Sequence, residues 1–402
     1  MNDNKLLNIP KRILPVIVFS QFAVTSLWFA GNAIISDLQS AMNVGIEDTG
    51  IVTSAIQLGF ISGTLIFALL SLSDRYSPRK IFFICSVLGS VSNLLIYFIA
   101  NSLFSLLVLR FITGFLLTGI YPIGMKIAAG WYKDKLGNAI GLLVGSLVLG
   151  TAFPHLIKSF GGSLLWEQVI FVVSGFSLAG GLLMYLVVDD GPYITSGTKF
   201  NPKAIVTIFK YKDLRSSALG YFGHMWELYT FWALIPVILI YYLKSNQMEM
   251  NISFWSFIII ASGSIGCTVG GIISKKSGSA KVAFTQLALS GICCLVSPLM
   301  FNTSAPIFLM YLIFWGIVVA GDSPQYSAIV ALAAPKELVG SGLTLVNSIG
   351  FLITILSLWV TYQFLGFMEI SPALLILSMG PIIGLISMRG IISKHLTDLA
   401  KL

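Results

Sequence analysis

Twelve apolar runs follow one another along the chain, separated by short polar turns. Each run is close to the roughly 20 residues that a helix needs to cross the hydrocarbon core of a bilayer. The runs cover residues 13–36, 50–72, 81–100, 103–126, 137–157, 166–188, 216–243, 253–273, 282–301, 306–330, 340–362 and 371–388. Only 10% of the 402 residues are charged and 56% are hydrophobic, so the chain lacks the polar surface of a soluble protein. We therefore predict an all-α membrane protein with twelve transmembrane helices.

The positions of the basic residues predict the orientation. Of the 24 Lys and Arg residues, 20 lie in the termini and in the turns on one side, whereas only Lys158 and Lys244 lie in the turns on the other side. Because Lys- and Arg-rich loops stay in the cytoplasm, both termini are predicted to be cytoplasmic. The lack of targeting signals favours a bacterial inner membrane. The formal charge of +8 is then explained by contact with anionic lipid rather than with nucleic acid.

The first run begins at Ile13, directly after Lys11 and Arg12. It is too long for the core of a signal peptide and has no cleavage site, so it is predicted to be an uncleaved first span. The cysteines all fall inside predicted spans and form no CxxC motif, so they are predicted to be reduced and buried, and no metal or cofactor is expected. They are Cys85, Cys267, Cys293 and Cys294.

The two halves of the chain resemble each other. A shift of 202 residues places Gly119 on Gly321, Pro122 on Pro324, Leu136 on Leu338, Leu143 on Leu345, Val144 on Val346, Ser146 on Ser348 and Arg79 on Lys281. Each half has six spans and starts on the same side, which predicts two parallel repeats. The predicted parts are a six-helix bundle at 1–188, a cytoplasmic linker at 189–215 and a second bundle at 216–402. In the linker, residues 201–211 are either a short amphipathic helix on the membrane surface or a plain tether.

The hairpin LSDRYSPRK at residues 72–80 joins the second and third spans. With the twelve spans in two sixes, it resembles the major facilitator superfamily of secondary transporters. The hairpin residues that match the family pattern are Asp74, Arg75, Arg79 and Lys80. Leu70 and Ser77 stand where the family has glycines. Arg110 and Gly114 are similar to the family's RxxxG element, which faces the central cavity.

This resemblance implies that Asp74 and its neighbours latch the two halves together on the cytoplasmic side. Asp74 is placed to cap the positive start of span eleven, near residues 338–341. Arg75 or Arg79 is expected to meet an acid such as Asp134 or Glu337.

Ionisable groups inside the spans are candidates for function, because a charge at the centre of a membrane helix costs about 2.5–3.5 kcal/mol on insertion scales. Glu227 lies near the middle of span seven, and His224 precedes it by three positions on the same helical face. A buried carboxyl group next to an imidazole can share or relay a proton. We interpret this pair as a proton-coupling site, with a structural hydrogen-bonded pair as the alternative.

Arg110 keeps its proton and needs an anion in span four. It is predicted to recruit an anionic substrate or to pair with Glu227 or Asp322 in one state of the cycle; a permanent ion pair is the alternative. Asp322 lies in the sequence GDSPQYS of span ten, where Pro324 interrupts the helix. Such interruptions present polar groups to cargo, so Asp322 is interpreted as cavity-lining rather than as a cap of the kink. Tyr121 lies in the corresponding interruption of the first repeat.

Two further groups are weaker candidates for contact with substrate. His155 follows Pro154, whose freed carbonyl can satisfy it, and Lys126 can extend to the interface. The residues predicted for substrate binding or proton coupling are Glu227, His224, Arg110, Asp322, Gln325, Tyr326, Tyr121, Asn32, Trp28 and Gln21. The aromatic residues Trp226, Tyr229 and Trp232 of span seven contact cargo only if they lie on the cavity face.

These patterns predict a transporter, not an enzyme, that binds a small solute between the halves and moves it by alternating access. Protons are the expected coupling ion, since the chain has membrane carboxyl groups and no GxxxxGK[ST] loop for ATP. The expected cargo is an anionic or zwitterionic metabolite, siderophore-like organic acids included, taken up by a monomer in the lipid bilayer. A proton-driven exporter and a transporter-like sensor or assembly factor remain alternatives.

Overall fold

The computed structural model describes residues 9–35, 37–38, 48–132, 136–160, 166–194 and 200–399, and all regular structure in these ranges is helical. The helices before the linker are α1 (Ile13–Thr25), α2 (Ala30–Ala33), α4 (Asp48–Leu69), α5 (Leu72–Arg75), α6 (Pro78–Ile99), α7 (Leu103–Leu117), α8 (Tyr121–Trp131), α9 (Leu136–Ser159) and α10 (Trp166–Val187). Those that follow are α11 (Ala204–Lys210), α12 (Lys212–Ser245), α13 (Ile252–Ser277), α14 (Ser279–Met300), α15 (Ala305–Gly321), α16 (Ser323–Ala333), α17 (Val339–Leu365), α18 (Ile370–Ala373) and α19 (Met379–Leu399), with 3₁₀ turns at Lys336–Leu338 and Leu374–Ser378.

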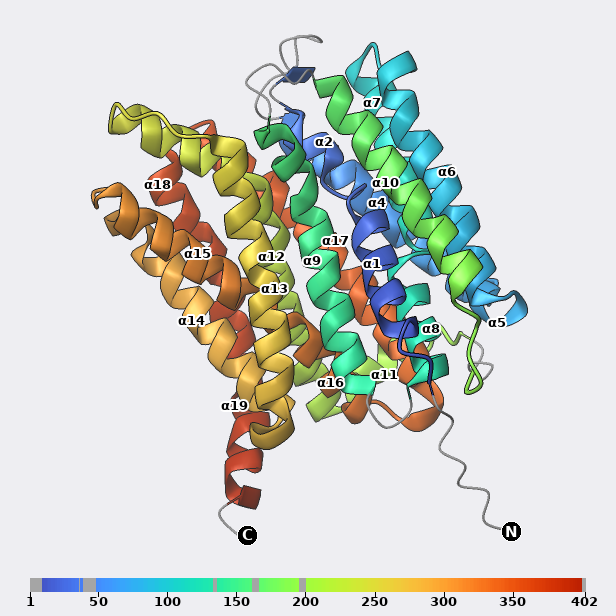
Figure 1. Ribbon diagram of the computed structural model, residues 1–402. Coiled ribbons are helices and arrows are strands. Elements are labelled where there is room, and N and C mark those ends of the chain that lie inside the picture. Colours follow the sequence, from blue (N-terminus) through green and yellow to red (C-terminus); the bar gives the residue numbers. More distant parts are fainter. Residues whose placement is uncertain are drawn as a thin grey trace, which may run out of the picture.

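Eleven helices in the described ranges are long and apolar enough to cross a membrane, and Ile13–Thr25 is a shorter apolar helix. Figure 1 shows them as two groups side by side, α1 to α10 in one and α12 to α19 in the other. The two groups meet mainly where α9 packs on α13 and where α4 packs on α17. The start of α1 and the end of α19 lie on the same side of the molecule, which we call the terminal side (Figure 1).

The first predicted span is not one continuous helix. Helix α1 ends at Thr25 and α2 begins at Ala30, so residues 26–29 separate them. This stretch contains neither proline nor glycine. The guanidinium group of Arg110 in α7 donates hydrogen bonds to the carbonyl oxygens of Leu27 (3.1 Å) and Trp28. Because a helix break frees carbonyl groups that must find donors inside a membrane, Arg110 stabilises the break.

The fourth and tenth spans are interrupted at matching places. Helix α7 gives way to α8 at residues 118–120, and α15 gives way to α16 at Asp322. Pro122 and Pro324 each stand in the first turn of the second helix, where a missing N–H group costs nothing. The 202-residue shift relates these two prolines, so both interruptions follow from the repeat.

Glycines set the closest helix contacts, and two of them are also related by the shift. A Cβ atom at Gly114 of α7 would lie 1.9 Å from the carbonyl oxygen of Ile56 in α4. A Cβ atom at Gly316 of α15 would lie 2.2 Å from the carbonyl oxygen of Ile259 in α13. Such small residues let helix backbones approach closely in membranes. Gly114 was expected to face the central cavity, and the structure instead packs it against α4.

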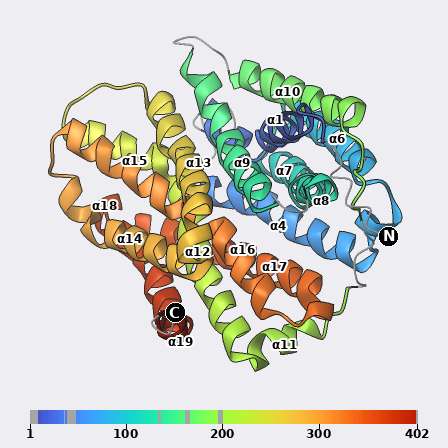
Figure 2. The same ribbon diagram turned by 60° about the horizontal axis from the view of Figure 1, so that its bottom comes forward.

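The linker between the groups contains the short helix α11. Ala204 and Ile208 are buried, whereas Val206 is 66% exposed. The backbone N–H of Asn201 donates to Ser341 Oγ in α17 at 2.9 Å, and Figure 2 shows α11 beside α17. The predicted helix therefore exists as a seven-residue segment docked on α17. Its contact with lipid and the boundaries 1–188, 189–215 and 216–402 remain predictions.

Candidate transport site

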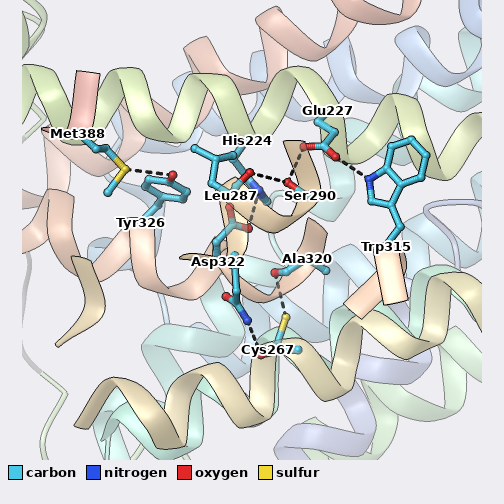
Figure 3. A network of polar contacts seen from close by, with 12 residues as sticks. His224, Glu227, Cys267, Leu287, Ser290, Trp315, Ala320, Asp322, Tyr326 and Met388 are labelled. Atoms are coloured by element: carbon cyan, nitrogen blue, oxygen red, sulfur yellow. Dashed lines mark hydrogen bonds and ion pairs between the residues drawn. The ribbon is translucent and has the colours of Figure 1, made fainter. Parts of the chain in front are cut away.

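A buried ion pair joins α12 to the interruption between α15 and α16. His224 Nδ1 lies 2.8 Å from Asp322 Oδ1, and each side chain is 1% exposed. The Asp322 side chain makes no hydrogen bond that caps α16. Tyr326 packs its ring 5.8 Å from the His224 ring and donates to Met388 Sδ at 3.2 Å (Figure 3). Asp322 thus acts as the partner of His224 rather than as a helix cap.

Glu227 lies in a separate cluster between α12, α14 and α15 (Figure 3). Its carboxyl group is fully buried and accepts hydrogen bonds from Trp315 Nε1 (2.6 Å), Ser290 Oγ (2.9 Å) and Cys294 Sγ (3.3 Å). All three donors are uncharged. The described residues place no cation within salt-bridge distance of Glu227.

The predicted pairing of His224 with Glu227 is therefore wrong. Three residues along an α-helix turn the side chain by about 300°, so the two groups share a face but diverge by about 60°. That divergence directs His224 toward α16 and Glu227 toward α14 and α15. The sequence shows their spacing but not which helices surround α12.

Arg110 is fully buried, and its hydrogen bonds go to the Leu27 and Trp28 carbonyls. Its guanidinium group lies against Gly31, where a Cβ atom would be 3.0 Å from Arg110 Nε. Across the described residues, none of the ion pairs includes Arg110. The predicted pair with Glu227 or Asp322 is absent from this state. Backbone carbonyls provide the negative partner instead.

A narrow central space of about 30 Å³ lies between the two groups. Its walls include Tyr121, Tyr221, Tyr229, Trp232, Ser323, Ser327, Asn347 and Phe351. Trp28 stacks on Tyr229 (ring centroids 5.8 Å apart) and on Phe351 (5.6 Å), which joins span one to spans seven and eleven. Phe29 meets Trp232 edge-on at 6.2 Å. We call Trp28, Phe29, Tyr229, Trp232 and Phe351 the aromatic layer; it closes the centre in this structure.

The remaining predicted residues lie in four different places. Tyr121 lines the central space. Gln21 is fully buried against α8, where its Oε1 would lie 2.3 Å from a Cβ atom at Gly124. Gln325 is 3% exposed and follows the interruption at Asp322. Asn32 donates to Thr53 Oγ1 at 2.7 Å and lines a cavity on the side opposite the termini, together with His155.

A cavity of about 290 Å³ opens on the terminal side between the two groups. Asp74 and Lys126 line it from one group, and Gly340 and Ser341 line it from the other. Lys126 Nζ donates to Asp74 Oδ1 at 2.5 Å and to the Ser73 carbonyl at 2.6 Å. Lys126, an expected interface or substrate group, thus holds Asp74 within its own half.

The expected latch contacts differ from those observed. Arg79 Nη1 lies 2.5 Å from Asp189 Oδ1, and the Arg79 backbone N–H donates to Asp190 Oδ1 at 2.9 Å, so the hairpin is tied to the start of the linker. Arg75 and Lys80 are exposed, as is Glu337. Asp134 lies outside the described residues. The hairpin turns at Ser71, whose φ of 51° is left-handed and normally favours glycine.

Sequence reasoning missed the partners of Glu227. Ser290, Cys294 and Trp315 lie 63 to 88 positions from Glu227 in the chain, and each is an ordinary residue of an apolar span. The sequence predicts Cys293 and Cys294 only as buried thiols, and it leaves open whether Tyr229 and Trp232 face the cavity. Trp226, by contrast, points away from the centre and donates from Nε1 to the Ile376 carbonyl at 3.0 Å.

Residues 17–358 match the sequence model of the Major Facilitator Superfamily. The chain belongs to this superfamily. It is a membrane transporter rather than an enzyme, as the sequence predicted. Superfamily structures share its fold: a human organic anion transporter, MFSD10, superposes with a TM-score of 0.70 at 16% identity, over 94% of this chain and 99% of that one. The proton:xylose symporter XylE gives a TM-score of 0.72 at 12% identity, over 93% and 94%.

Two superfamily relatives are similar in sequence. A probable sulfoacetate transporter of Cupriavidus necator is 23% identical over 289 residues, which cover 64% of this chain and 66% of the relative, just under two thirds of its length. A multi-drug resistance efflux pump of Streptococcus pneumoniae is 23% identical over 330 residues, which cover 77% of this chain and 80% of the pump.

Proposed function

We propose that this superfamily member is a proton-coupled secondary transporter that moves a small organic anion or zwitterion across the bacterial inner membrane by alternating access. The observation that carries the proposal is Glu227, a fully buried carboxyl group whose donors are all uncharged. A carboxylate in hydrocarbon is costly without a cation, so gain and loss of a proton is the chemistry open to this group.

The His224–Asp322 pair supports the same proposal. The pair joins α12 to the interruption of span ten, one helical turn from Glu227. A proton arriving on Asp322 would remove its attraction for His224 and release the start of α16 from α12. Coupling of protonation to movement of α16 then needs no residue beyond those observed.

The two cavities support alternating access. One cavity, of about 290 Å³, opens on the terminal side, and another, of about 190 Å³, lies on the opposite side. Between them the aromatic layer leaves a central space of only about 30 Å³. Parting of the layer on one side at a time would expose the centre alternately. We place the terminal side in the cytoplasm because its turns hold the basic residues.

The buried positive charge of Arg110 in the first half supports the proposal of an anionic cargo. Arg110 is buried behind Trp28 of the aromatic layer, where its charge is balanced by carbonyl dipoles rather than by a carboxylate of the described chain. Trp232 lines the central space, and its Nε1 donor finds no partner among the described residues. The C. necator relative bears the name of a transporter for sulfoacetate, an organic anion.

The test uses the purified protein in liposomes with sulfoacetate and a panel of small carboxylates and sulfonates. We expect at least one of these anions to accumulate inside when the outside is acidic, and a protonophore to abolish the accumulation. Equal accumulation with and without the pH gradient would contradict proton coupling. Uptake of cations or neutral solutes but of none of these anions contradicts the substrate class.

Export is the second candidate direction, favoured by the similarity to the S. pneumoniae efflux pump. Intact cells distinguish the two directions. Uptake predicts that cells expressing the protein gain the anion and that a protonophore lowers its level. Export predicts that the same cells hold less of it and that a protonophore raises its level.

A further inference from the structure

A cavity of about 190 Å³ lies between the two groups on the side opposite the termini. We call it the His155 cavity. Asn32 and His155 contribute to its wall from the first group, and Ser253 and Ser256 from α13 of the second. Val237 and Ile240 of α12 form an apolar wall.

The aromatic layer separates the His155 cavity from the central space. In α12, Trp232 of the layer lines the central space, whereas Ala233, Pro236 and Val237 line the His155 cavity. The two spaces share none of their described lining residues. A solute that occupied this cavity would therefore lie beside the layer, on the side away from the termini, at a place distinct from the centre.

Three buried polar atoms of the cavity residues have no hydrogen-bond partner among the described residues. They are His155 Nε2, Asn32 Oδ1 and Ser256 Oγ. The residues are 2%, 5% and 0% exposed, respectively. Buried polar groups in folded proteins are nearly always satisfied, because leaving one unpaired is costly. Three such atoms around one cavity indicate a ligand or ordered water that completes their hydrogen bonds.

The hydrogen-bonding groups of the cavity, rather than its charges, bear on the ligand. The described lining contains no Asp, Glu, Lys or Arg, so an oxyanion there would be held by neutral donors, as anions are in other buried sites, and a cation would find no carboxylate. The nearby Lys158 is paired with Asp37 of the same half. His155 and Ser256 can both donate to oxyanion oxygens, and Asn32 Oδ1 can accept from a hydroxyl group or water beside them. Val237 and Ile240 suit the carbon part of a small molecule.

We propose that the His155 cavity is a second binding site, which holds a small organic anion by its carboxylate or sulfonate group outside the aromatic layer. This site shares its solute class with the proposed function but requires neither transport nor proton coupling. An anion bound there lies between bulk water and the central space.

The experiment measures protection of a cysteine placed in the cavity. Ser253→Cys is made in the full-length protein, reconstituted in nanodiscs so that both sides are open, and its reaction rate with a maleimide is followed. The chain without this substitution supplies the background, since its own four cysteines are buried. Sulfoacetate is the probe, choline is the cationic control and acetamide is the neutral control.

We expect sulfoacetate to slow the labelling of Ser253→Cys, and choline and acetamide to leave it unchanged. Adding His155→Ala should raise the half-protecting sulfoacetate concentration about 10-fold, the loss expected for one hydrogen bond to a charged group. His155→Gln, which keeps a donor, should recover most of the protection. Asn347→Ala, which alters the central space, should leave it unchanged.

The proposal is overturned if sulfoacetate does not protect Ser253→Cys. It is also overturned if sulfoacetate protects Ser253→Cys equally well with and without the His155→Ala substitution. Ser256→Ala provides a second, milder variant if His155→Ala is unstable, and it should also weaken protection. The assay contains no pH gradient. If the liposome assay shows no proton coupling, the labelling result still stands. If sulfoacetate gives no protection in the labelling assay, the transport proposal still stands.

Discussion

His224 Nδ1 lies 2.8 Å from Asp322 Oδ1 with both side chains about 1% exposed, so α12 and the interrupted tenth span are joined by a buried pair. Removing one partner of such a pair leaves the other buried and unpaired, which typically costs about 3–5 kcal/mol. Thermal unfolding of the purified protein should show a clearly lower Tm for His224→Ala and for Asp322→Leu.

The double variant His224→Ala with Asp322→Leu provides the control for this pair. Its loss of Tm should be smaller than the sum of the two single losses, since the second substitution removes a group that is already unpaired. Tyr326→Phe, which removes only the weak contact with Met388 Sδ, should change the Tm little. Additive losses in the double variant would show that the two residues act independently.

Close packing of α7 on α4 depends on Gly114. A Cβ atom there would meet the Ile56 carbonyl oxygen at 1.9 Å, so Gly114→Ala forces the helices apart and should cost about 1–3 kcal/mol. Gly175→Ala is the matched control, because a Cβ atom at Gly175 of α10 would meet nothing within 4 Å. Equal Tm values for the two variants would contradict this account of the packing.

The broken first span depends on Arg110. Lysine keeps the charge but lacks the planar fork that reaches both the Leu27 and Trp28 carbonyls. Arg110→Lys should therefore lower the Tm and slow transport, and Arg110→Met should do both more strongly. Wild-type transport rates in Arg110→Lys would show that charge alone suffices.

Much of this fold follows from the sequence, because length and hydropathy determine the spans and the 202-residue shift relates Pro122 to Pro324. The break at residues 26–29 could not be predicted in this way. The donor that stabilises it, Arg110, is 82 positions away from Trp28, and residues 26–29 contain neither proline nor glycine. Likewise, the spacing of His224 and Glu227 gives their shared face, whereas their partners depend on how α14, α15 and α16 pack around α12.

The contact between Asp74 and Lys126 lines the terminal-side cavity and faces Gly340 and Ser341 of the other group. We expect Asp74→Asn to weaken the state that is closed on the terminal side and to reduce transport without loss of expression. Lys126→Gln, which removes the positive charge that faces Asp74, should also reduce transport. Uptake rates per amount of protein measure both effects, and unchanged uptake kinetics in Asp74→Asn would exclude this role.

Proton coupling through Glu227 is tested most directly by comparing solute exchange with gradient-driven accumulation in Glu227→Gln. Glutamine keeps the shape: its Oε1 can accept from Trp315 Nε1 and its Nε2 can donate to Ser290 Oγ, but it cannot exchange a proton. In liposomes, with an anion that the unaltered protein accumulates, Glu227→Gln should retain exchange of labelled for unlabelled solute and lose accumulation driven by the pH gradient. Full accumulation in this variant would contradict the assignment of Glu227 as a coupling residue.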